Sequence, residues 1–86
     1  MAKDDIILLT ILSPEKKILE ALVSKVELPG GKGRFTVLRD HAPVISSLTE
    51  GVVSYVSDGK PGSVRVKAGF VEIKANGVTV CAEVGI

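Results

Sequence analysis

Apolar and polar positions alternate with a period of two in the second half of the chain. In residues 64–68 and 71–75, Val, Ile and Ala alternate with Arg, Lys and Glu, which is the pattern of half-buried β-strands. Asn76-Gly77 separates the second run from residues 78–80, where the alternation resumes. Asn-Gly between alternating runs favours a type I′ turn, because both central residues of that turn need φ > 0. The sequence therefore predicts a β-hairpin here.

Segments rich in glycine and proline divide the rest of the chain into short pieces. Residues 29–33 (Pro-Gly-Gly-Lys-Gly) and 58–62 (Asp-Gly-Lys-Pro-Gly) are predicted to be loops. Short strands are predicted at residues 35–38, 44–48 and 52–56. Many short strands with turns about every ten residues are typical of an all-β sandwich or barrel.

Residues 14–27 carry two competing signals. Ser13-Pro14 looks like a helix N-cap followed by Pro at the first helical position, and the apolar residues of 18–26 fall on one helical face. The alternation over residues 25–28 instead favours a strand with a bulge near Ser24. The local pattern leaves both interpretations open.

The first apolar run, residues 6–12, offers hydrophobic groups to both faces of a strand. A sandwich strand normally has one dry and one wet face. Either this strand is covered on both sides, or its outer face is available to a partner.

Composition narrows the class of protein. The 86 residues fit one domain, and we expect a single domain over residues 1–86. Aromatics make up 3% and Trp is absent, so the core must consist of Val, Ile, Leu and Ala. The 11 basic and 10 acidic residues are scattered, and the basic stripe of a nucleic-acid surface is missing. The run 6–12 is too short for a transmembrane helix and no signal-peptide cleavage pattern follows it, so we expect a soluble protein.

No catalytic or metal-binding constellation can be assembled from the sequence. His41 is the only histidine, and Cys81, the only cysteine, lies in an apolar run where a small buried hydrophobic residue is expected. The two make a poor nucleophile pair, because reactive thiols lie partly exposed near positive charge. The segment Gly30–Gly33 lacks the Ser or Thr and the helix of a P-loop. We therefore expect neither an enzyme nor a metal or cofactor site.

An ordered set of short motifs runs through nearly the whole chain. It comprises Ser13-Pro14-Glu15, residues 26–38 (Val-Glu-Leu-Pro-Gly-Gly-Lys-Gly-Arg-Phe-Thr-Val-Leu), His41-Ala42-Pro43, and residues 48–53, 68–73, 76–80 and 82–83. In this order the motifs resemble the epsilon subunit of F-type ATP synthases, whose mitochondrial counterpart is called delta. No single motif is decisive, but the ordered set is specific.

The resemblance implies a fold. The amino-terminal domain of that family is a flattened sandwich of two roughly five-stranded sheets, so residues 14–27 are expected to be extended. Family members usually continue into a carboxy-terminal helical hairpin that regulates ATP hydrolysis. This sequence ends at Gly85-Ile86, where the hairpin would begin, so we expect no hairpin here and do not transfer its regulatory functions.

The resemblance also implies partners and a role. Family members bind the rotary gamma subunit and rest on the membrane-embedded ring, as non-catalytic central-stalk subunits that couple gamma to the ring during proton- or sodium-driven ATP synthesis. The implied location is peripheral, on the cytoplasmic face of a bacterial plasma membrane or the matrix side in a mitochondrion.

Candidate contact residues follow from position. Ser13, His41 and Ser46 resemble family residues turned toward gamma, and Leu8 and Leu12 are added from the doubly apolar first strand. His41 has an alternative interpretation as a loop histidine that bonds nearby backbone before Pro43. The ring-contact candidates are Gly30, Gly31, Lys32, Gly33 and Arg34. Many relatives carry acidic residues in that loop, so the two cations change its expected polarity.

A second hypothesis is a free-standing ligand-binding sandwich, such as a carbohydrate-binding module. It requires exposed aromatic side chains as stacking platforms, and only Phe35, Tyr55 and Phe70 are available.

Overall fold

The computed structural model describes residues 6–84. These residues form strands joined by turns and contain no helix, so within this range no helix could cross a membrane. The strands are β1 (Ile7–Leu12), β2 (Lys17–Val23), β3 (Lys25–Gly30), β4 (Gly33–Val37), β5 (Val44–Leu48), β6 (Gly51–Ser57), β7 (Lys60–Lys74) and β8 (Gly77–Val84).

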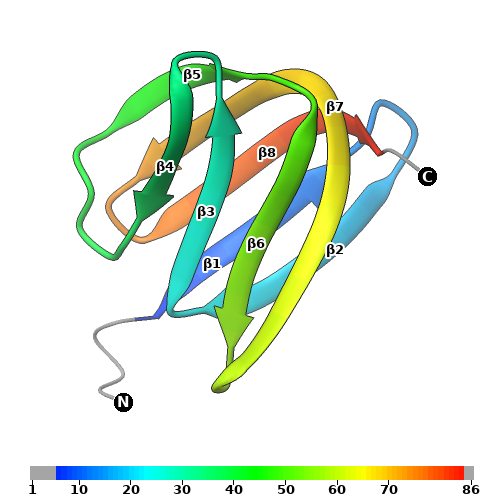
Figure 1. Cartoon of the computed structure of the whole chain (residues 1–86). Coiled ribbons are helices and arrows are strands. Elements are labelled where there is room, and N and C mark those ends of the chain that lie inside the picture. The colour runs from blue at the N-terminus through cyan, green and yellow to red at the C-terminus, as the bar shows by residue number, and fades with distance from the viewer. Residues whose placement is uncertain (1–5, 85–86) are drawn as a thin grey trace.

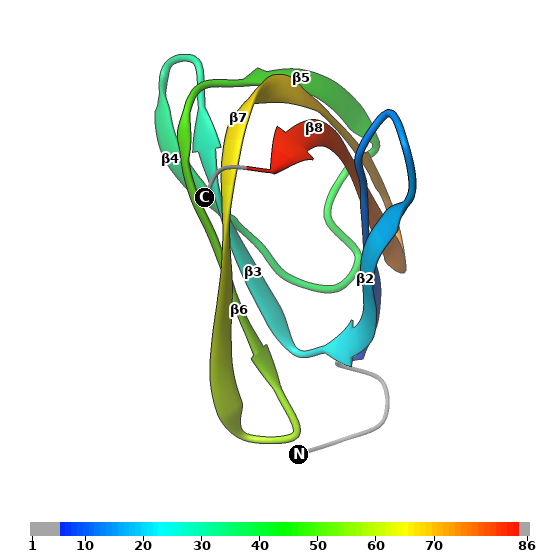
Figure 2. The same cartoon turned by 90° about the vertical axis from the view of Figure 1, so that its right-hand side faces the viewer.

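The strands stack in two layers that share one long strand (Figures 1 and 2). The five-stranded layer has the order β2-β1-β8-β7-β5, and the four-stranded layer comprises β4, β3, β6 and the first half of β7. Strands β1 and β8 pair in parallel, and all other pairs are antiparallel. The expected all-β sandwich is confirmed, with β7 joining its layers into one continuous sheet.

Strand β7 changes layer where its register with β8 shifts, between Val66 and Gly69. Residues 60–66 pair with β6 in one layer, and residues 69–74 pair with β8 and β5 in the other. At Gly69 the backbone of β7 comes so close to β8 that an added Cβ would overlap the Cys81 carbonyl oxygen and lie 2.6 Å from the Ala82 Cβ. Only glycine fits this bend.

The core between the layers is entirely aliphatic, and no polar or charged side chain is buried among the described residues. It follows the predicted alternation most clearly in β1, the second half of β7 and β8, where buried inward residues alternate with outward ones. The buried hydrophobic residues are Ile7, Leu9, Ile11, Val23, Val26, Leu28, Val37, Leu48, Val53, Val66, Val71, Ile73, Val78, Val80 and Ala82.

The extended interpretation of residues 14–27 is confirmed, and the helix is wrong. Strand β2 runs antiparallel to β1, and the chain then crosses to the other layer at Ser24, whose N–H donates to the Val56 carbonyl at 2.8 Å. The bulge expected near Ser24 is therefore a corner between two strands, and the register shift of this region lies instead at Ile11/Leu12. The apolar residues of this segment occur at helical spacing because β2 has half-buried residues on both faces, so its apolar residues do not alternate strictly with polar ones.

The hairpin predicted at Asn76-Gly77 forms, but the turn type was wrong. Lys74 pairs with Gly77, so the turn residues are Ala75 and Asn76, and neither has a positive φ. Gly77 takes the last position of the turn, which type I turns favour. The positive φ pair lies in the hairpin between β6 and β7, at Asp58 (54°) and Gly59 (76°). The loop predicted over residues 58–62 is therefore a two-residue turn of the I′ kind.

Replacing Gly69 by Ala is expected to lower the free energy of unfolding by about 1–3 kcal/mol, because the new methyl group must displace the backbone of β8. Urea unfolding followed by circular dichroism measures the change. Gly77→Ala is the matched control, since the nearest atom to its added Cβ is the Leu8 oxygen at 3.8 Å. Equal stabilities of the two variants would contradict the close approach at Gly69.

Candidate interaction surfaces

The outer face of the four-stranded layer is polar. Its outward side chains include ion-pairing and hydroxyl groups, with Val52 and Val56 between them. The polar members are Lys25, Glu27, Arg34, Thr36, Ser54, Ser63 and Arg65. This is the composition of a solvated surface.

The outer face of the five-stranded layer is different, because large hydrophobic side chains protrude from it. Leu22, Ile45 and Phe70 are exposed by 61%, 70% and 62%, and Leu8 by 41%. We call this set the apolar face; its members are Leu8, Leu12, Leu22, Ile45, Phe70 and Cys81. A polar row of Glu20, Thr10, Thr79 and Glu72 separates Leu8 and Leu22 from Leu12, Cys81 and Phe70, so the face holds two hydrophobic groups. Exposed hydrophobic groups on one side of a small domain mark an interaction surface.

Strand register brings members of the apolar face together from distant parts of the sequence. Leu8 lies opposite Leu22 across the β1–β2 pair. Leu12 lies opposite Cys81, and Cys81 lies opposite Phe70, so these three form a row across β1, β8 and β7. The row lines a shallow hollow of about 490 Å³ that also includes Ser13 and Pro14. The outer side of β1 therefore remains open among the described residues, with Leu8 and Leu12 on it.

Cys81 is exposed, so the expectation that it is buried is wrong. In β8 the inward positions are Val78, Val80 and Ala82, which places Cys81 on the outside with Thr79. The alternation itself predicted this, but the apolar character of the run concealed it.

Ser13 closes the turn between β1 and β2. Its hydroxyl oxygen accepts hydrogen bonds from the N–H groups of Glu15 (3.3 Å) and Lys16 (3.1 Å), and the hydroxyl donates to the Lys16 carbonyl at 3.1 Å. A helix N-cap makes similar bonds, but here they close a turn that leads into a strand, so the helix start predicted at Ser13-Pro14 is wrong. The hydroxyl is thus occupied within the chain.

His41 lies in the connection between β4 and β5, at the opposite end of the molecule from the β1–β2 turn (Figure 1). Its Nδ1 lies 2.9 Å from the Ala42 carbonyl oxygen, so this nitrogen carries the proton and donates it. The connection is fastened to the β7–β8 turn, because the Asp40 N–H donates to the Ala75 carbonyl at 2.7 Å. The expected local backbone bond is present, and it leaves Nε2 available to a partner.

The predicted loop at residues 29–33 is mostly strand. Pro29 pairs with Arg34 and Gly30 with Gly33, so the turn consists of Gly31 and Lys32 alone. Gly33 has φ 124°, which only glycine adopts readily.

The turn between β3 and β4 lies beside β5. Residues 30–35 form a shallow polar hollow of about 420 Å³ together with Ser46 and Ser47. Ser46 thus lies next to the ring-contact candidates and apart from Ser13 and His41, and the proposed gamma contacts do not form one cluster.

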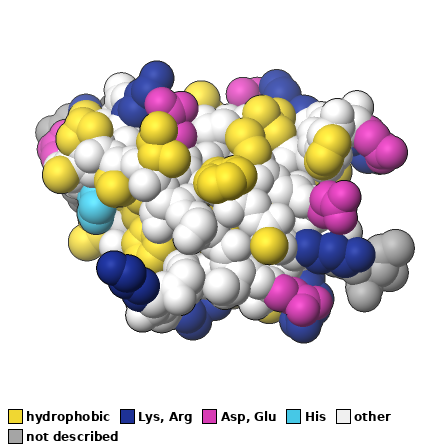
Figure 3. Space-filling view, turned by 90° about the horizontal axis from the view of Figure 1, so that it is seen from above, with side chains coloured by type: hydrophobic (Ala, Val, Ile, Leu, Met, Phe, Trp, Pro, Cys, Tyr) yellow, Lys and Arg dark blue, Asp and Glu magenta, His cyan; other side chains and the backbone are white. Residues whose placement is uncertain are grey.

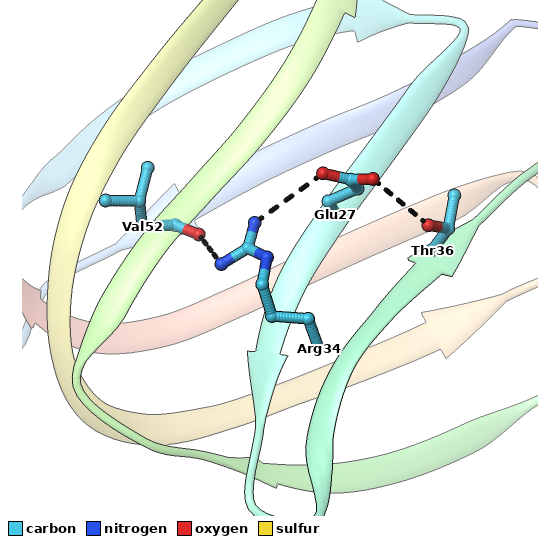
Figure 4. A network of polar contacts seen from close by, with 4 residues as sticks. All are labelled: Glu27, Arg34, Thr36 and Val52. Carbon is cyan, nitrogen blue, oxygen red and sulfur yellow. Dashed lines mark hydrogen bonds and ion pairs between the residues drawn. The ribbon is translucent and has the colours of Figure 1, made fainter.

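Arg34 is held inside the chain, although it is exposed (Figure 4). Its guanidinium donates to the Val52 carbonyl of β6 at 2.8 Å and lies 3.8 Å from a Glu27 carboxylate oxygen of β3. The other oxygen of Glu27 accepts a bond from the Thr36 hydroxyl at 3.5 Å. This network ties β4, β3 and β6 together. Lys32, at the tip of the turn, is exposed as well.

Sequence reasoning missed Leu22, Ile45 and Phe70. The signal was present in two cases. Leu22 lies two residues from Glu20 in β2, and Phe70 two residues from Glu72 in β7, so each shares a strand face with a charged residue.

Phe35 and Tyr55 pack against the core, which leaves Phe70 as the one strongly exposed aromatic side chain in residues 6–84. A ligand-binding surface built on several stacking platforms is not supported. Within this same range, no group of three His, Cys, Asp or Glu residues could hold a metal ion.

The sequence matches the family described as ATP synthase, Delta/Epsilon chain, beta-sandwich domain, over residues 7–86. The chain belongs to this ATP synthase delta/epsilon family. It is 41% identical over 75 residues to the ATP synthase epsilon chain of Desulfitobacterium hafniense, covering 87% of this chain and 57% of that one. The epsilon chain of Rhodobacter capsulatus is 40% identical over 76 residues, covering 88% and 58%. The chain thus spans somewhat more than half the length of these epsilon chains.

Solved ATP synthases contain the same fold. A chain in the Euglena gracilis mitochondrial ATP synthase (OSCP/F1/c-ring) superposes with a TM-score of 0.87 at 20% identity, covering 94% of this chain and 53% of that one. A chain in the central stalk/c-ring structure of the Tetrahymena thermophila enzyme gives 0.73 at 16% identity, covering 95% and 66%. The sandwich fold of this chain is therefore also present in chains of low sequence identity to it.

Replacing Ser13 by Ala is expected to lower the free energy of unfolding by about 0.5–2 kcal/mol, because the turn loses its cap. Urea unfolding gives the value. In the control variant Ser46→Ala the lost hydroxyl donates to the adjacent Ser47 carbonyl, and we expect a change within about 0.5 kcal/mol. If Ser13→Ala were as stable as the control, the cap would not matter and a contact role for Ser13 would gain support.

Replacing Arg34 by Ala is expected to destabilise the domain by about 0.5–1 kcal/mol, since its bonds to Val52 and Glu27 are lost at a half-exposed site. Lys32→Ala, which removes a cation from the adjacent turn, is expected to change stability by less than about 0.5 kcal/mol. Chemical denaturation of both variants makes the comparison. The opposite order would show that the network of Figure 4 does not brace the layer.

Proposed function

We propose that residues 1–86 form one β-sandwich domain that serves as a non-catalytic central-stalk (rotor) subunit of an F-type ATP synthase. It binds the gamma subunit and couples it to the membrane-embedded ring during proton- or sodium-driven ATP synthesis. Family membership supports this role, and so do the structural relatives in assemblies described as central stalk and c-ring. The observation that carries the proposal is the apolar face, which gives the domain a surface for a permanent partner.

The apolar face is the surface that meets gamma. A permanent interface is largely apolar and buries more than about 1,000 Å², and it needs large side chains near its centre. Phe70 and the row it shares with Cys81 and Leu12 meet that need, and the Leu8–Leu22 pair lies on the same face beyond the row of Thr10 and Thr79. The polar face of the other layer stays in water.

The turn between β3 and β4 is the part that meets the ring. It projects at the end of the molecule that carries β5 (Figure 1), and its tip consists of Gly31 and Lys32. Arg34 contributes stiffness to this hairpin through its bonds to β3 and β6. The charge presented to the ring is therefore that of Lys32.

A rotor coupling needs a body that transmits torque without bending. The dry aliphatic core gives the sandwich low compressibility, and the shared strand β7 prevents the two layers from sliding apart. As part of the synthase the domain lies peripherally, on the cytoplasmic face of a bacterial plasma membrane or on the matrix side in a mitochondrion.

Titration calorimetry of the chain with the gamma subunit from the same source tests the proposal. We expect sub-micromolar binding with a negative heat-capacity change, which marks burial of apolar surface. Leu8→Asp and Phe70→Asp change exposed members of the apolar face and are expected to weaken binding at least about thirtyfold.

The matched control is Ser63→Asp, which adds the same charge to the outer face of the four-stranded layer. Its affinity for gamma should equal that of the unmodified chain. Failure of the folded, unmodified chain to bind gamma would overturn the proposed function. Equal weakening by the control would move the interface away from the apolar face.

A further inference from the structure

Four strands border the open sides of the sandwich: β2 and β5 in the five-stranded layer, and β4 and the first half of β7 in the other. All of them except β5 carry charges, which in the first half of β7 are Lys60 and Arg65. Strand β2 pairs with β1 and contains the ion pair between Lys17 and Glu20, at 3.4 Å. Strand β4 pairs with β3 and contains Arg34. Charged side chains on edge strands prevent unwanted pairing with other chains. Strand β5 has the sequence Val-Ile-Ser-Ser-Leu and contains no charge.

Strand β5 presents hydrophobic side chains on both of its faces. Consecutive residues of a strand point to opposite sides, and here Val44 is exposed by 42% and Ile45 by 70%. At the end of the molecule where β5 lies, hydrophobic and uncharged side chains occupy the middle of the view and most charged ones lie at its rim (Figure 3). An uncharged, apolar edge of this kind is a template for strand addition.

The backbone groups of Ile45 point away from the sheet. On the side away from β7, the Ser47 carbonyl accepts a hydrogen bond from the Gly31 N–H at 3.3 Å. Backbone groups alternate in direction along an antiparallel strand, so Ile45 directs its N–H and C=O to that same side, and Ser46 directs its own to β7. The β3–β4 turn covers β5 only as far as the bond between Gly31 and Ser47.

We propose that β5 is a strand-pairing edge, to which an extended and uncharged segment of the gamma subunit adds as a further strand of the five-stranded layer. This inference rests on the proposed function. Ile45 and Phe70 are diagonal neighbours on the apolar face, because Ser47 lies opposite Phe70 and Ile45 opposite Glu72. The partner that covers Phe70 therefore reaches the edge of β5, and main-chain bonds to Ile45 extend the same interface.

The test separates the backbone of Ile45 from its side chain. Ile45→Ala removes the side chain and keeps the N–H, whereas Ile45→Pro also removes the outward N–H and places a ring in the path of an added strand. Pro is tolerated at edge positions whose N–H faces solvent, and circular dichroism checks that both variants fold. The unmodified chain and both variants are titrated with the gamma subunit, and amide hydrogen exchange of the unmodified chain is measured with and without gamma.

We expect Ile45→Pro to bind gamma at least about tenfold more weakly than Ile45→Ala, with the loss of one edge bond and the steric block acting together. Gamma should slow exchange of the Ile45 amide at least about tenfold and leave the Ser46 amide, which faces β7, nearly unchanged. If Ile45→Pro does not fold, the exchange measurement on the unmodified chain decides.

Contrary outcomes are distinct from one another. Normal gamma binding by both variants, with no protection of the Ile45 amide, overturns the edge pairing and leaves the proposed function intact. No gamma binding by the unmodified chain overturns the proposed function and the inference together. Self-association of the chain that is lost in Ile45→Pro, with gamma binding unaffected, assigns the edge to a second copy of this chain and overturns the gamma assignment.

Discussion

The close contact between β7 and β8 at Gly69 is the constraint on which the two-layer architecture depends. Strand β7 supplies hydrogen-bonding partners to β6 in one layer and to β8 and β5 in the other. A strand can serve both layers only if it bends sharply, and the bend requires a position without a side chain. Because the two halves of β7 meet at this point, the inward and outward positions of the three strands that pair with them (β5, β6 and β8) depend on it.

Once the interior is fixed, the two outer faces can serve different purposes. Each strand divides its residues between core and surface, and the buried core is drawn from the inward set. The outward set of the four-stranded layer is polar and is braced by Arg34 and Glu27. The outward set of the five-stranded layer retains Leu22 and Phe70, both of which are more than half exposed. Such side chains make physical sense when a second protein covers them.

The all-β class and the β7–β8 hairpin could be predicted from the sequence because period-two alternation is a direct consequence of strand geometry. The path of residues 14–27 could not, since β2 is a half-buried strand at an open side of the sandwich and its apolar residues fit a helix equally well. The turn type at Asn76-Gly77 could not be predicted for a related reason. Asn76-Gly77 and Asp58-Gly59 look alike locally, and only the register of the flanking strands decides which residues become the central pair.

The contact candidates show the same limit. Motif position named Ser13 and Arg34, yet the side chains of both are engaged within the chain, one in a turn and one in a network across three strands. The alternation of side chains along each strand would have identified Phe70 and Leu22, because a hydrophobic residue two positions from a charged one lies on the same, outward face. A small domain buries only about 60% of the surface its unfolded chain exposes, so it has little stability to lose. Exposed hydrophobic residues in such a domain therefore indicate a partner more strongly than a motif does, and β5 adds an uncharged edge beside them.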